Sequence, residues 1–401
     1  PAMQRVRVRF HDGQIAFGNH RSVVVLTFNA AMVRDVGIFK TLDRPPAEWI
    51  ERLGNLIGQG STHMCHIPIV PAYCEGVKIY VYRLKFRNRF RQLTERDGLL
   101  LEGEAGWGEV SPFWDYDDAT AANWLAGGVE AAQVGYPTQM RDSIRVNETI
   151  PAVDADTAYA LAADSTCQTF KVKIADHPQS LAEDLARLEA VRAAQPDAKI
   201  RVDANAAWDV ATAVRHIRQM DVAAGGLEYV EQPCRSVEDM AAVRRKVDVP
   251  IAADESIRLD NAIEDIKRMD AADVAVLKNQ PLGGVRAALA LQDTLGLPIV
   301  VSSAVESSVG LRAGLALAAS LPELPHACGL ATSRLFERDV AANPLTPIGG
   351  EIAIRDIVPE YSEPVSAELT ARWQSRLRAM WEHATRGGQV SGDYEFMGGL
   401  R

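Results

Sequence analysis

Apolar runs recur along the middle of the chain, between Thr169 and Gln280, and each run ends in an ionisable residue. The runs read TFKVKIA, KIRVDAN, LEYVEQP, PIAADES and VAVLKN. Their ionisable residues follow one another at intervals of 23 to 30 residues, about the length of one strand, one helix and two loops. The segments between them have helical patterns of apolar positions, such as LAEDLARLEAVRAA and AIEDIKRM. This alternation predicts a repeated βα unit.

The same alternation extends beyond this stretch in both directions. RVNETIPA precedes it, and PIVVSSA and PHACGL follow it. Apolar strands joined by amphipathic helices are typical of a parallel sheet that is buried on both faces. About eight such strands are enough to close a (β/α) barrel. We therefore expect an α/β protein with a (β/α)-barrel catalytic domain over residues 145–330.

The segments on either side of the barrel differ from it in pattern. Residues 1–75 form an extension of unknown role, in which VVVLTFNAAMV predicts a strand and PPAEWIERLGNLIGQG a short helix. Residues 76–144 predict an α+β capping domain, with VKIYVYRLKF and GLLLEGEAGWGEV as two strands followed by a helix. Residues 331–401 contain a helix with an apolar face, so we expect this C-terminal segment to pack back on the cap or the barrel.

Six ionisable residues lie at the ends of the predicted strands two to six. They are Lys171 and Lys173 on the second strand, Asp203, Glu231 and Asp254 on the third to fifth, and Lys278 on the sixth. Active sites of such barrels lie at the carboxyl ends of the strands. Because side chains alternate along a strand, Lys171 and Lys173 point the same way, and Lys278 approaches from the opposite wall.

Three carboxylates without a histidine or cysteine partner are the oxygen ligands that Mg²⁺ or Mn²⁺ prefers. The alternative, that each carboxylate only pairs with a lysine or arginine of the barrel interior, stays open. Burial beside other cations lowers the pKa of a lysine toward the range of a base, and Lys171 beside Lys173, near a divalent cation, meets those conditions. The set predicts removal of a proton next to a carboxylate, assisted by a divalent ion.

Two further stretches are candidates for substrate binding. Gly283 and Gly284 follow the sixth strand at the start of a helix, and Ser302 and Ser303 follow the seventh. Backbone N–H groups and hydroxyls at helix N-termini favour anions, so a second carboxylate of the substrate could bind there. Ordinary helix capping explains the same residues and stays open as an alternative.

Composition narrows the class of partner. The chain of 401 residues is 47% hydrophobic and carries a net charge of −10 without a long Lys/Arg run, which argues against nucleic acid and anionic membranes. No apolar run approaches the roughly 18 residues of a membrane span. Five scattered cysteines favour a reducing compartment, so we expect a cytoplasmic protein. The group His63, Cys65, His66 and Cys74 matches no common zinc spacing.

Seven motifs of this sequence, taken in order, resemble those of a known protein family. FKVKIA, RVDANAAW, VEQP, ADES, LKNQPLGGVRAAL, VVSSAVESSVGLRAGLALAA and LPHACGL stand in this order. From about Val77 to Pro344 the chain resembles the enolase superfamily, and more closely the o-succinylbenzoate synthases of the actinobacterial type. The resemblance implies an enolase-type barrel whose cap, around GEAGWGEVSPFWDY, closes over the active site. It also implies Mg²⁺-dependent dehydration of 2-succinyl-6-hydroxy-2,4-cyclohexadiene-1-carboxylate to 2-succinylbenzoate, a step of menaquinone biosynthesis.

The resemblance also implies a role for each matching residue. Lys173 would remove the proton and then assist the departure of hydroxide, and Lys278 would stabilise the enediolate. The metal ligands would be Asp203, Glu231 and Asp254, and the supporting groups would be Lys171, Arg201 and Asn205. Two departures from the family pattern are Ala206, where we expect glycine, and the polar pair Asn279 and Gln280 in LKNQ.

Three other functions compete with this one. The first is another member of the same superfamily, an N-acylamino acid racemase, a dipeptide epimerase or a muconate cycloisomerase. The second is a Schiff-base barrel enzyme, in which a lysine forms an imine and no metal is needed. The third is a non-catalytic barrel that uses residues 1–75 for interaction. For the function that the resemblance implies, the expected partner is a small-molecule carboxylate substrate. The oligomeric state stays open.

Overall fold

The structure is a computed structural model, and it describes residues 7–11, 14–19, 22–27, 72–90, 93–258 and 262–400. The chain divides into two units, Pro1–Pro71 and Ala72–Arg401. The first unit contains a three-stranded antiparallel sheet of β1 (Arg7–His11), β2 (Gln14–Asn19) and β3 (Ser22–Thr27). The first part of the strand predicted in VVVLTFNAAMV is confirmed as β3. The rest of that segment and the helix predicted in PPAEWIERLGNLIGQG lie outside the described residues.

The second unit begins with a four-stranded sheet in the order β16-β4-β5-β6. Its strands are β4 (Ala72–Phe90), β5 (Leu93–Gly103), β6 (Gly106–Val110) and β16 (Val390–Gly399). The sequence predicted one strand for GLLLEGEAGWGEV, but a turn at residues 104–105 divides it into β5 and β6. Gly106 follows this turn with a φ of 131°, a conformation that side chains rarely adopt.

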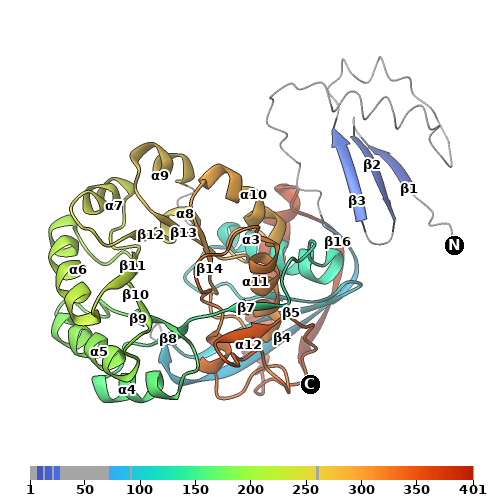
Figure 1. Ribbon diagram of the computed structural model, residues 1–401. Helices are drawn as coiled ribbons and strands as arrows, with labels where there is room; N and C mark the ends of the chain where they lie inside the picture. The colour runs from blue at the N-terminus through green and yellow to red at the C-terminus, as the bar shows by residue number, and fades with distance from the viewer. Residues whose placement is uncertain are drawn as a thin grey trace. The chain divides into compact units, whose positions relative to one another are not determined.

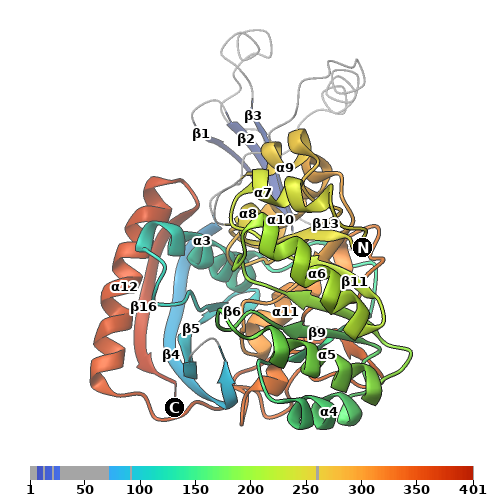
Figure 2. The same ribbon diagram turned by 90° about the vertical axis from the view of Figure 1, so that its left-hand side faces the viewer.

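Two helices pack on this sheet, and together they form the cap. They are α3 (Asp118–Val129), which continues as a π-helical turn (Glu130–Val134), and α12 (Ala367–Arg386). In α12, the buried residues Trp373, Leu377, Met380 and Ala384 recur every three or four positions and so form one apolar face. This face packs with Trp124 of α3 in a hydrophobic cluster of its own. Figure 2 shows α12 and β16 lying alongside β4, so the C-terminal segment is part of the cap.

A curled parallel sheet forms the barrel, in the order β14-β13-β12-β11-β10-β9-β8 (Figure 1). Its strands are β8 (Glu148–Ile150), β9 (Thr169–Lys173), β10 (Lys199–Asp203), β11 (Leu227–Glu231), β12 (Ile251–Ala253), β13 (Val274–Leu277) and β14 (Ile299–Val301). The predicted eighth strand, PHACGL, is reduced to two parallel bridges, Cys328 to Val146 and Gly329 to Ser302. These bridges join the two edges of the sheet and close the barrel.

Helices follow the strands around the outside. They are α4 (Ala155–Asp164), α5 (Leu181–Ala194), α6 (Val210–Ala224), α7 (Val237–Arg244), α8 (Glu255–Arg258), α9 (Ile263–Met269), α10 (Val285–Leu295) and α11 (Ser308–Ser320). Several begin where the sequence supplies a capping side chain: Asp154, Asp209 and Ser236 each accept a hydrogen bond from a first-turn N–H group. After the barrel come a 3₁₀ turn (Thr332–Leu335) and β15 (Glu351–Ala353), which pairs with β7 (Ser143–Arg145).

The core of the barrel has two faces, as the strand alternation predicts. Phe170, Val172 and Val202 point outward into the large hydrophobic cluster that includes residues of the helices. A smaller cluster of Tyr229, Ala252, Val274, Val276 and Val300 occupies alternate strand positions inside the barrel. The expected α/β fold, a (β/α) barrel with an α+β cap, is confirmed.

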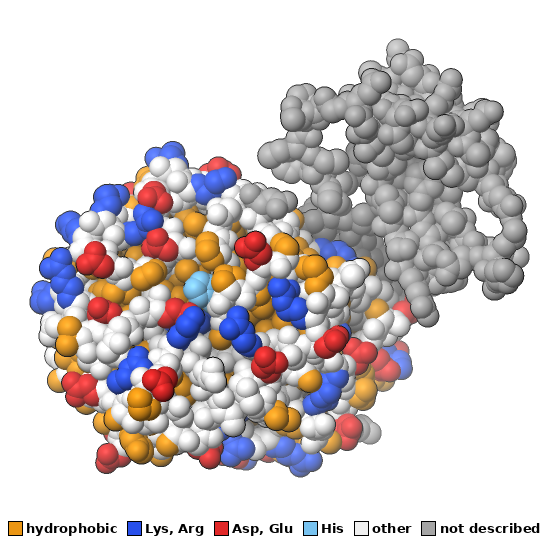
Figure 3. All heavy atoms as spheres, viewed as in Figure 1, with side chains coloured by type: hydrophobic (Ala, Val, Ile, Leu, Met, Phe, Trp, Pro, Cys, Tyr) orange, Lys and Arg blue, Asp and Glu red, His pale blue; other side chains and the backbone are white. Residues whose placement is uncertain are grey.

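The surface gives no simple charge pattern. On the face of the second unit that Figure 3 shows, acidic and basic side chains are interspersed among apolar and other polar ones. No helix in the described part of the chain has the length and apolarity that crossing a membrane requires.

Candidate active site

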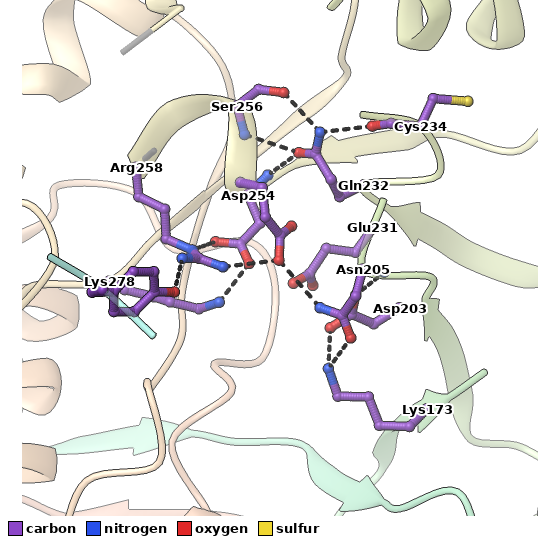
Figure 4. A network of polar contacts seen from close by, with 12 residues as sticks. Lys173, Asp203, Asn205, Glu231, Gln232, Cys234, Asp254, Ser256, Arg258 and Lys278 are labelled. Atoms are coloured by element: carbon purple, nitrogen blue, oxygen red, sulfur yellow. Dashed lines mark hydrogen bonds and ion pairs between the residues drawn. The ribbon is translucent and has the colours of Figure 1, made fainter. Parts of the chain in front are cut away.

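Strand pairing brings the predicted ionisable residues to one level. In the parallel register, Lys173 of β9 lies opposite Asp203 of β10, which in turn lies opposite Glu231 of β11. Asp254 directly follows β12, and Lys278 directly follows β13. Because paired residues of neighbouring strands point to the same face, all five side chains converge inside the carboxyl end of the barrel. Figure 4 shows Lys173 and Lys278 approaching the carboxylates from different sides.

Ammonium groups lie directly against two of the carboxylates. The Nζ atom of Lys171 is 3.0 Å from Oδ2 of Asp203 and 2.7 Å from Oε1 of Glu231. Lys173 also pairs with Asp203, and its Nζ atom donates a hydrogen bond of 3.0 Å to Oδ1 of Asn205. Both carboxylates are only 1% exposed, so these charges interact with little screening by water.

The third carboxylate has two cationic partners. The Nζ atom of Lys278 is 2.5 Å from Oδ2 of Asp254, and Nε of Arg258 is 3.0 Å from Oδ1. A second guanidinium nitrogen of Arg258 donates a hydrogen bond of 2.8 Å to the hydroxyl of Tyr116 in the cap. All three predicted metal ligands are therefore paired with cations in this structure, which is the alternative that the sequence left open.

Burial and neighbouring charges shift the pKa values of this group in opposite directions. Burial raises the pKa of Glu231 to about 7, and the negative charges of Asp203 and Asp254 contribute to the rise. Burial alone would raise the pKa of Asp203 and Asp254 as well, but their cationic neighbours outweigh it and hold both values below the usual range. At Lys171, burial lowers the pKa, but Asp203 and Glu231 outweigh it and raise the pKa above normal. The lowered pKa predicted for Lys171 is not seen here.

The chemistry of the three carboxylates fits a divalent cation. Each carboxylate is buried, and each supplies oxygen atoms of the kind that Mg²⁺ binds. The negative charges of Asp203 and Asp254 repel that of Glu231, which is why its pKa is raised. A cation would relieve that repulsion. Within the described residues, no group of three histidine, cysteine or acidic side chains is already arranged as a metal site, since the lysines lie against the carboxylates. A metal bound there would replace these ammonium contacts.

A cavity lies above the carboxylates, between the barrel and the cap. Lys171, Lys173, Lys278 and Asn205 line it, and so does the pair Ser302 and Ser303, which the sequence predicted for substrate binding. The cap contributes three aromatic residues, Phe113, Tyr116 and Trp124. The remaining barrel residues are Thr149, Arg258, Pro281, Ala304, Val305, Gly329 and Thr332.

Arg201 does not line this cavity. It is two residues before Asp203 on β10 and fully buried, and its guanidinium pairs with Glu228 at 2.6 Å. It also donates to the hydroxyl of Tyr229 at 2.8 Å and to the backbone carbonyl of Ala327 at 2.9 Å. These contacts place Arg201 one layer deeper in the barrel, where it supports the interior without reaching the cavity.

The predicted anion site at Gly283 and Gly284 is filled by the protein itself. Glu130 of the cap accepts hydrogen bonds from the N–H groups of Val285, at 2.7 Å, and Arg286, at 3.2 Å. Gly284 has a φ of 117°, and a Cβ atom there would lie 2.0 Å from Oε2 of Glu130. Glycine is needed at this position to admit the carboxylate of the cap, and neither glycine lines the cavity.

The next barrel helix, α11, has the same kind of cap. Oε2 of Glu109 accepts hydrogen bonds from the N–H groups of Ser307, at 3.1 Å, and Gly310, at 3.0 Å. Asp339 accepts one from the N–H group of Ser308 at 3.1 Å. Carboxylates of this chain therefore occupy the N-termini of both helices.

Comparisons with known proteins agree with this geometry. An enolase C-terminal domain-like model matches residues 154–359, and an enolase N-terminal domain-like model matches residues 81–132. The chain is 53% identical over 312 residues to the o-succinylbenzoate synthase of Thermobifida fusca, covering 76% of this chain and 97% of that protein. It is 47% identical over 318 residues to the o-succinylbenzoate synthase of Mycobacterium tuberculosis, covering 79% and 94%.

The chain belongs to the o-succinylbenzoate synthase family of the enolase superfamily.

Solved structures place this o-succinylbenzoate synthase homologue among enzymes with the same fold. The L-Ala-D/L-Glu epimerase of Bacillus subtilis aligns with a TM-score of 0.62 at 21% identity, covering 71% of this chain and 96% of that one. A muconate lactonizing enzyme from Pseudomonas fluorescens aligns at 0.61 and 22%, covering 75% and 98%. At such identities the likeness shows the fold alone.

The structure of this family member also reveals residues that sequence reasoning missed. Gln232 accepts hydrogen bonds from the backbone N–H groups of Asp254, at 3.0 Å, and Ser256, at 3.2 Å, and so holds the segment that carries the third carboxylate. Arg258 stands four residues after Asp254, a spacing that predicts contact on a helix. Tyr116 ends the segment GEAGWGEVSPFWDY, which the resemblance assigned to the cap over the active site. No sequence pattern pointed to Trp124, because the cap reaches the barrel only through tertiary packing.

Proposed function

We propose that the chain is an o-succinylbenzoate synthase that dehydrates 2-succinyl-6-hydroxy-2,4-cyclohexadiene-1-carboxylate to 2-succinylbenzoate, with Mg²⁺ as its metal and Mn²⁺ as a substitute. The observation that supports this best is the placement of Lys173 and Lys278. Both line one cavity, they come from β9 and from the end of β13, and the three carboxylates lie between these strands. Identity of 53% and 47% to two o-succinylbenzoate synthases supports the same reaction.

Asp203, Glu231 and Asp254 would hold the metal, which supplies positive charge next to the carboxylate of the substrate. The Nζ atom of Lys173 would take the proton from ring carbon 1, beside this carboxylate. The electron pair of the broken C–H bond moves into the carboxylate as an enediolate, whose negative charge lies near the ammonium of Lys278. Lys171, beside the same carboxylates, and Asn205, which accepts from Lys173, would keep the base in position.

The second half of the reaction uses the proton that Lys173 has gained. The electron pair returns to the ring, the bond from carbon 6 to its hydroxyl breaks, and Lys173 delivers the proton to the leaving oxygen. Water and an aromatic ring result. Because one amine takes and returns the proton, the two groups must leave from the same face of the ring, which is a syn elimination.

The wall of the cavity across from the strands that carry the carboxylates has hydroxyl groups. Ser302 and Ser303 follow β14, and Thr149 and Thr332 lie beside them in the lining. The hydroxyl groups of Ser303 and Thr332 share a hydrogen bond of 2.8 Å. These side chains offer donors to the oxygen atoms of the substrate that are remote from the reacting carbon, and we assign Ser302 and Ser303 to substrate binding.

The setting that we propose is menaquinone biosynthesis in the cytoplasm. Within the described residues, Cys167, Cys234 and Cys328 are buried free thiols, as expected in a reducing compartment. The substrate is a small dicarboxylate, and we assign no role to nucleic acid or membrane.

A substrate comparison tests this proposal. Purified protein with Mg²⁺ is expected to convert the cyclohexadiene substrate to 2-succinylbenzoate, to lose this activity in EDTA and to regain it when Mg²⁺ is restored. A Schiff-base enzyme would keep its activity in EDTA. Racemisation of N-acylamino acids or dipeptides without dehydration would contradict the proposal.

A further inference from the structure

Trp124 of the cap lines the catalytic cavity, and its buried indole N–H group has no hydrogen-bond acceptor within the described residues. The side chain is 1% exposed, so water does not satisfy this donor in place of protein. Buried polar groups in folded proteins almost always have a partner, and an exception next to a cavity points to a ligand. Two separate observations thus concern Trp124: its N–H group has no acceptor, and its side chain lines the cavity.

Two other tryptophans of the cap, Trp373 and Trp114, have an acceptor for the indole N–H group. Nε1 of Trp373 donates a hydrogen bond of 2.6 Å to Oδ1 of Asp97, and Nε1 of Trp114 donates one of 3.0 Å to the same atom. All three rings belong to or pack on the same hydrophobic cluster. Trp114 and Trp373 thus have an acceptor for the indole N–H group, and Trp124 differs from them in lacking one and in lining the cavity.

Of the three cap residues that line the cavity, Trp124 carries the polar side-chain atom that has no hydrogen-bond partner within the described residues. Phe113 has no N–H or O–H in its side chain, and the hydroxyl of Tyr116 accepts a hydrogen bond from Arg258 at 2.8 Å while keeping its own O–H to donate. The ring of Tyr116 packs on that of Trp124 with centroids 5.1 Å apart, which fixes the plane of the indole. The N–H group is thus held in one direction before a ligand arrives.

We propose that Trp124 donates a hydrogen bond to an oxygen atom of the succinyl chain of the substrate, and so selects for acyl side chains that carry such an oxygen. This inference rests on the proposed function. The reacting carbon has to lie between Lys173 and Lys278 on the barrel, so the part of the substrate remote from it faces the cap. Trp124 is then a specificity-determining residue and not an acid or a base.

The variant Trp124→Phe keeps an aromatic ring and removes the donor. Its dissociation constant for 2-succinylbenzoate, measured by calorimetric titration in Mg²⁺, is expected to rise about tenfold. For 2-butylbenzoate, which lacks both oxygen-bearing groups of the chain, it is expected to stay within about twofold of the wild type. An equal loss for both ligands, or a loss for neither, would overturn the proposal. A third ligand, 2-butyrylbenzoate, keeps the ketone and lacks the distal carboxylate. If Trp124→Phe weakens its binding as well, the hydrogen bond goes to the ketone; if its affinity is unchanged, the bond goes to the distal carboxylate.

The matched control is Trp373→Phe, which removes an indole N–H from the same cluster but one that bonds to Asp97. It is expected to lower stability and to leave the ratio of the two dissociation constants unchanged. Where Trp124→Phe fails to fold, wild-type protein with ¹⁵N-labelled indoles gives the answer: the Trp124 resonance, assigned by elimination, shifts with 2-succinylbenzoate and not with 2-butylbenzoate. An unshifted resonance overturns the assignment.

Failure of the proposed function would appear in measurements on the wild-type protein alone. A wild-type protein that neither dehydrates the cyclohexadiene substrate nor binds 2-succinylbenzoate would contradict the proposed function. Failure of the Trp124 assignment appears only in the difference between the wild type and the variant.

Discussion

The carboxyl ends of the strands and the N-termini of the helices lie at the same end of the barrel, and their carboxylates have different partners. At the strand ends, three carboxylates point inward toward lysines that line a cavity. At the N-termini of α10 and α11, the carboxylates of Glu130, Glu109 and Asp339 point at backbone N–H groups. In the first arrangement, charged side chains line a cavity that a ligand can enter. In the second, N–H groups at the start of each helix are already bonded to carboxylates of the same chain.

The difference shows why the two kinds of terminus are unequal guides to function. A carboxylate on an inward strand position of a closed barrel has to find a partner inside the barrel, so its presence in the sequence indicates a site. The N–H groups at a helix N-terminus accept any nearby carboxylate, including one from the same chain. A helix start alone therefore does not identify a substrate site.

Removing the base is expected to have the largest effect. Lys173→Ala should lower kcat by about 10³-fold or more, because it removes the group that carries the proton, while 2-succinylbenzoate still binds. Lys199→Ala is the matched control: this lysine starts β10 at the opposite end of the barrel and is exposed. Steady-state rates of dehydration check both variants, and a Lys173→Ala enzyme with more than about a tenth of the wild-type rate would rule out Lys173 as the base.

A helix-end carboxylate is expected to matter for stability instead. Glu109→Gln places an amide N–H₂ group among the donors of Tyr82, Ser111, Ser307 and Gly310. The free energy of unfolding should fall by about 3 kcal/mol, as measured by urea denaturation, because buried charged hydrogen bonds are lost.

The control for this variant is Glu95→Gln, whose carboxylate is 39% exposed and pairs with Arg83. Its unfolding free energy should change by less than about 1 kcal/mol. If Glu109→Gln were as stable as this control, the cap of α11 would contribute nothing and the comparison of the two termini would fail.

Glu306, in the loop between β14 and α11, gives a pH dependence of its own. Burial raises its pKa to about 7, the charge of Glu109 adds to the rise, and Oε1 has no partner within the described residues. The folded state thus binds a proton that the unfolded state releases at its ordinary pKa of 4.5. The contribution to stability is full below pH 4.5 and is lost as the pH rises toward 7.

Glu306→Gln should therefore become more stable relative to the wild type, by about 2 to 3 kcal/mol, between pH 4.5 and pH 8. Urea denaturation at several pH values measures this difference. The exposed Glu323→Gln serves as control and should show a difference that does not change with pH. A constant difference for Glu306→Gln as well would mean that this carboxylate ionises normally in the folded protein.

The smallest effect concerns the loop that follows the Asp203 strand. Ala206 has a φ of 63°, which costs an alanine about 1 to 2 kcal/mol, and glycine avoids that cost. Ala206→Gly is expected to raise the unfolding free energy by about 1 kcal/mol, after allowing for the greater entropy of unfolded glycine. Ala186→Gly, at an exposed position inside α5, should lower it by about as much. Thermal unfolding of the pair checks the signs, and equal signs would contradict this account of Ala206.

The sequence was a good guide to the strands and a poor one to the cap. Apolar runs of the right length predicted β9 to β14, and the ionisable residue at the end of each run predicted the convergence of Lys173, Asp203 and Glu231. Arg201 shares the inward face with Asp203, but strand alternation does not tell which layer of a barrel a side chain occupies. The contacts of Glu130 and Trp124 with the barrel depend on how the cap docks, and no local pattern encodes that.

Titration of Mg²⁺ into the protein tests most directly whether the strand-end carboxylates form a metal site. Calorimetry should show one Mg²⁺ bound per chain, and Asp203→Asn should weaken this binding at least about tenfold, because a charged ligand is lost. Asp209→Asn, which alters only the exposed cap of α6, should bind Mg²⁺ like the wild type. An affinity that Asp203→Asn leaves unchanged would remove Asp203 from the ligand set and contradict the account.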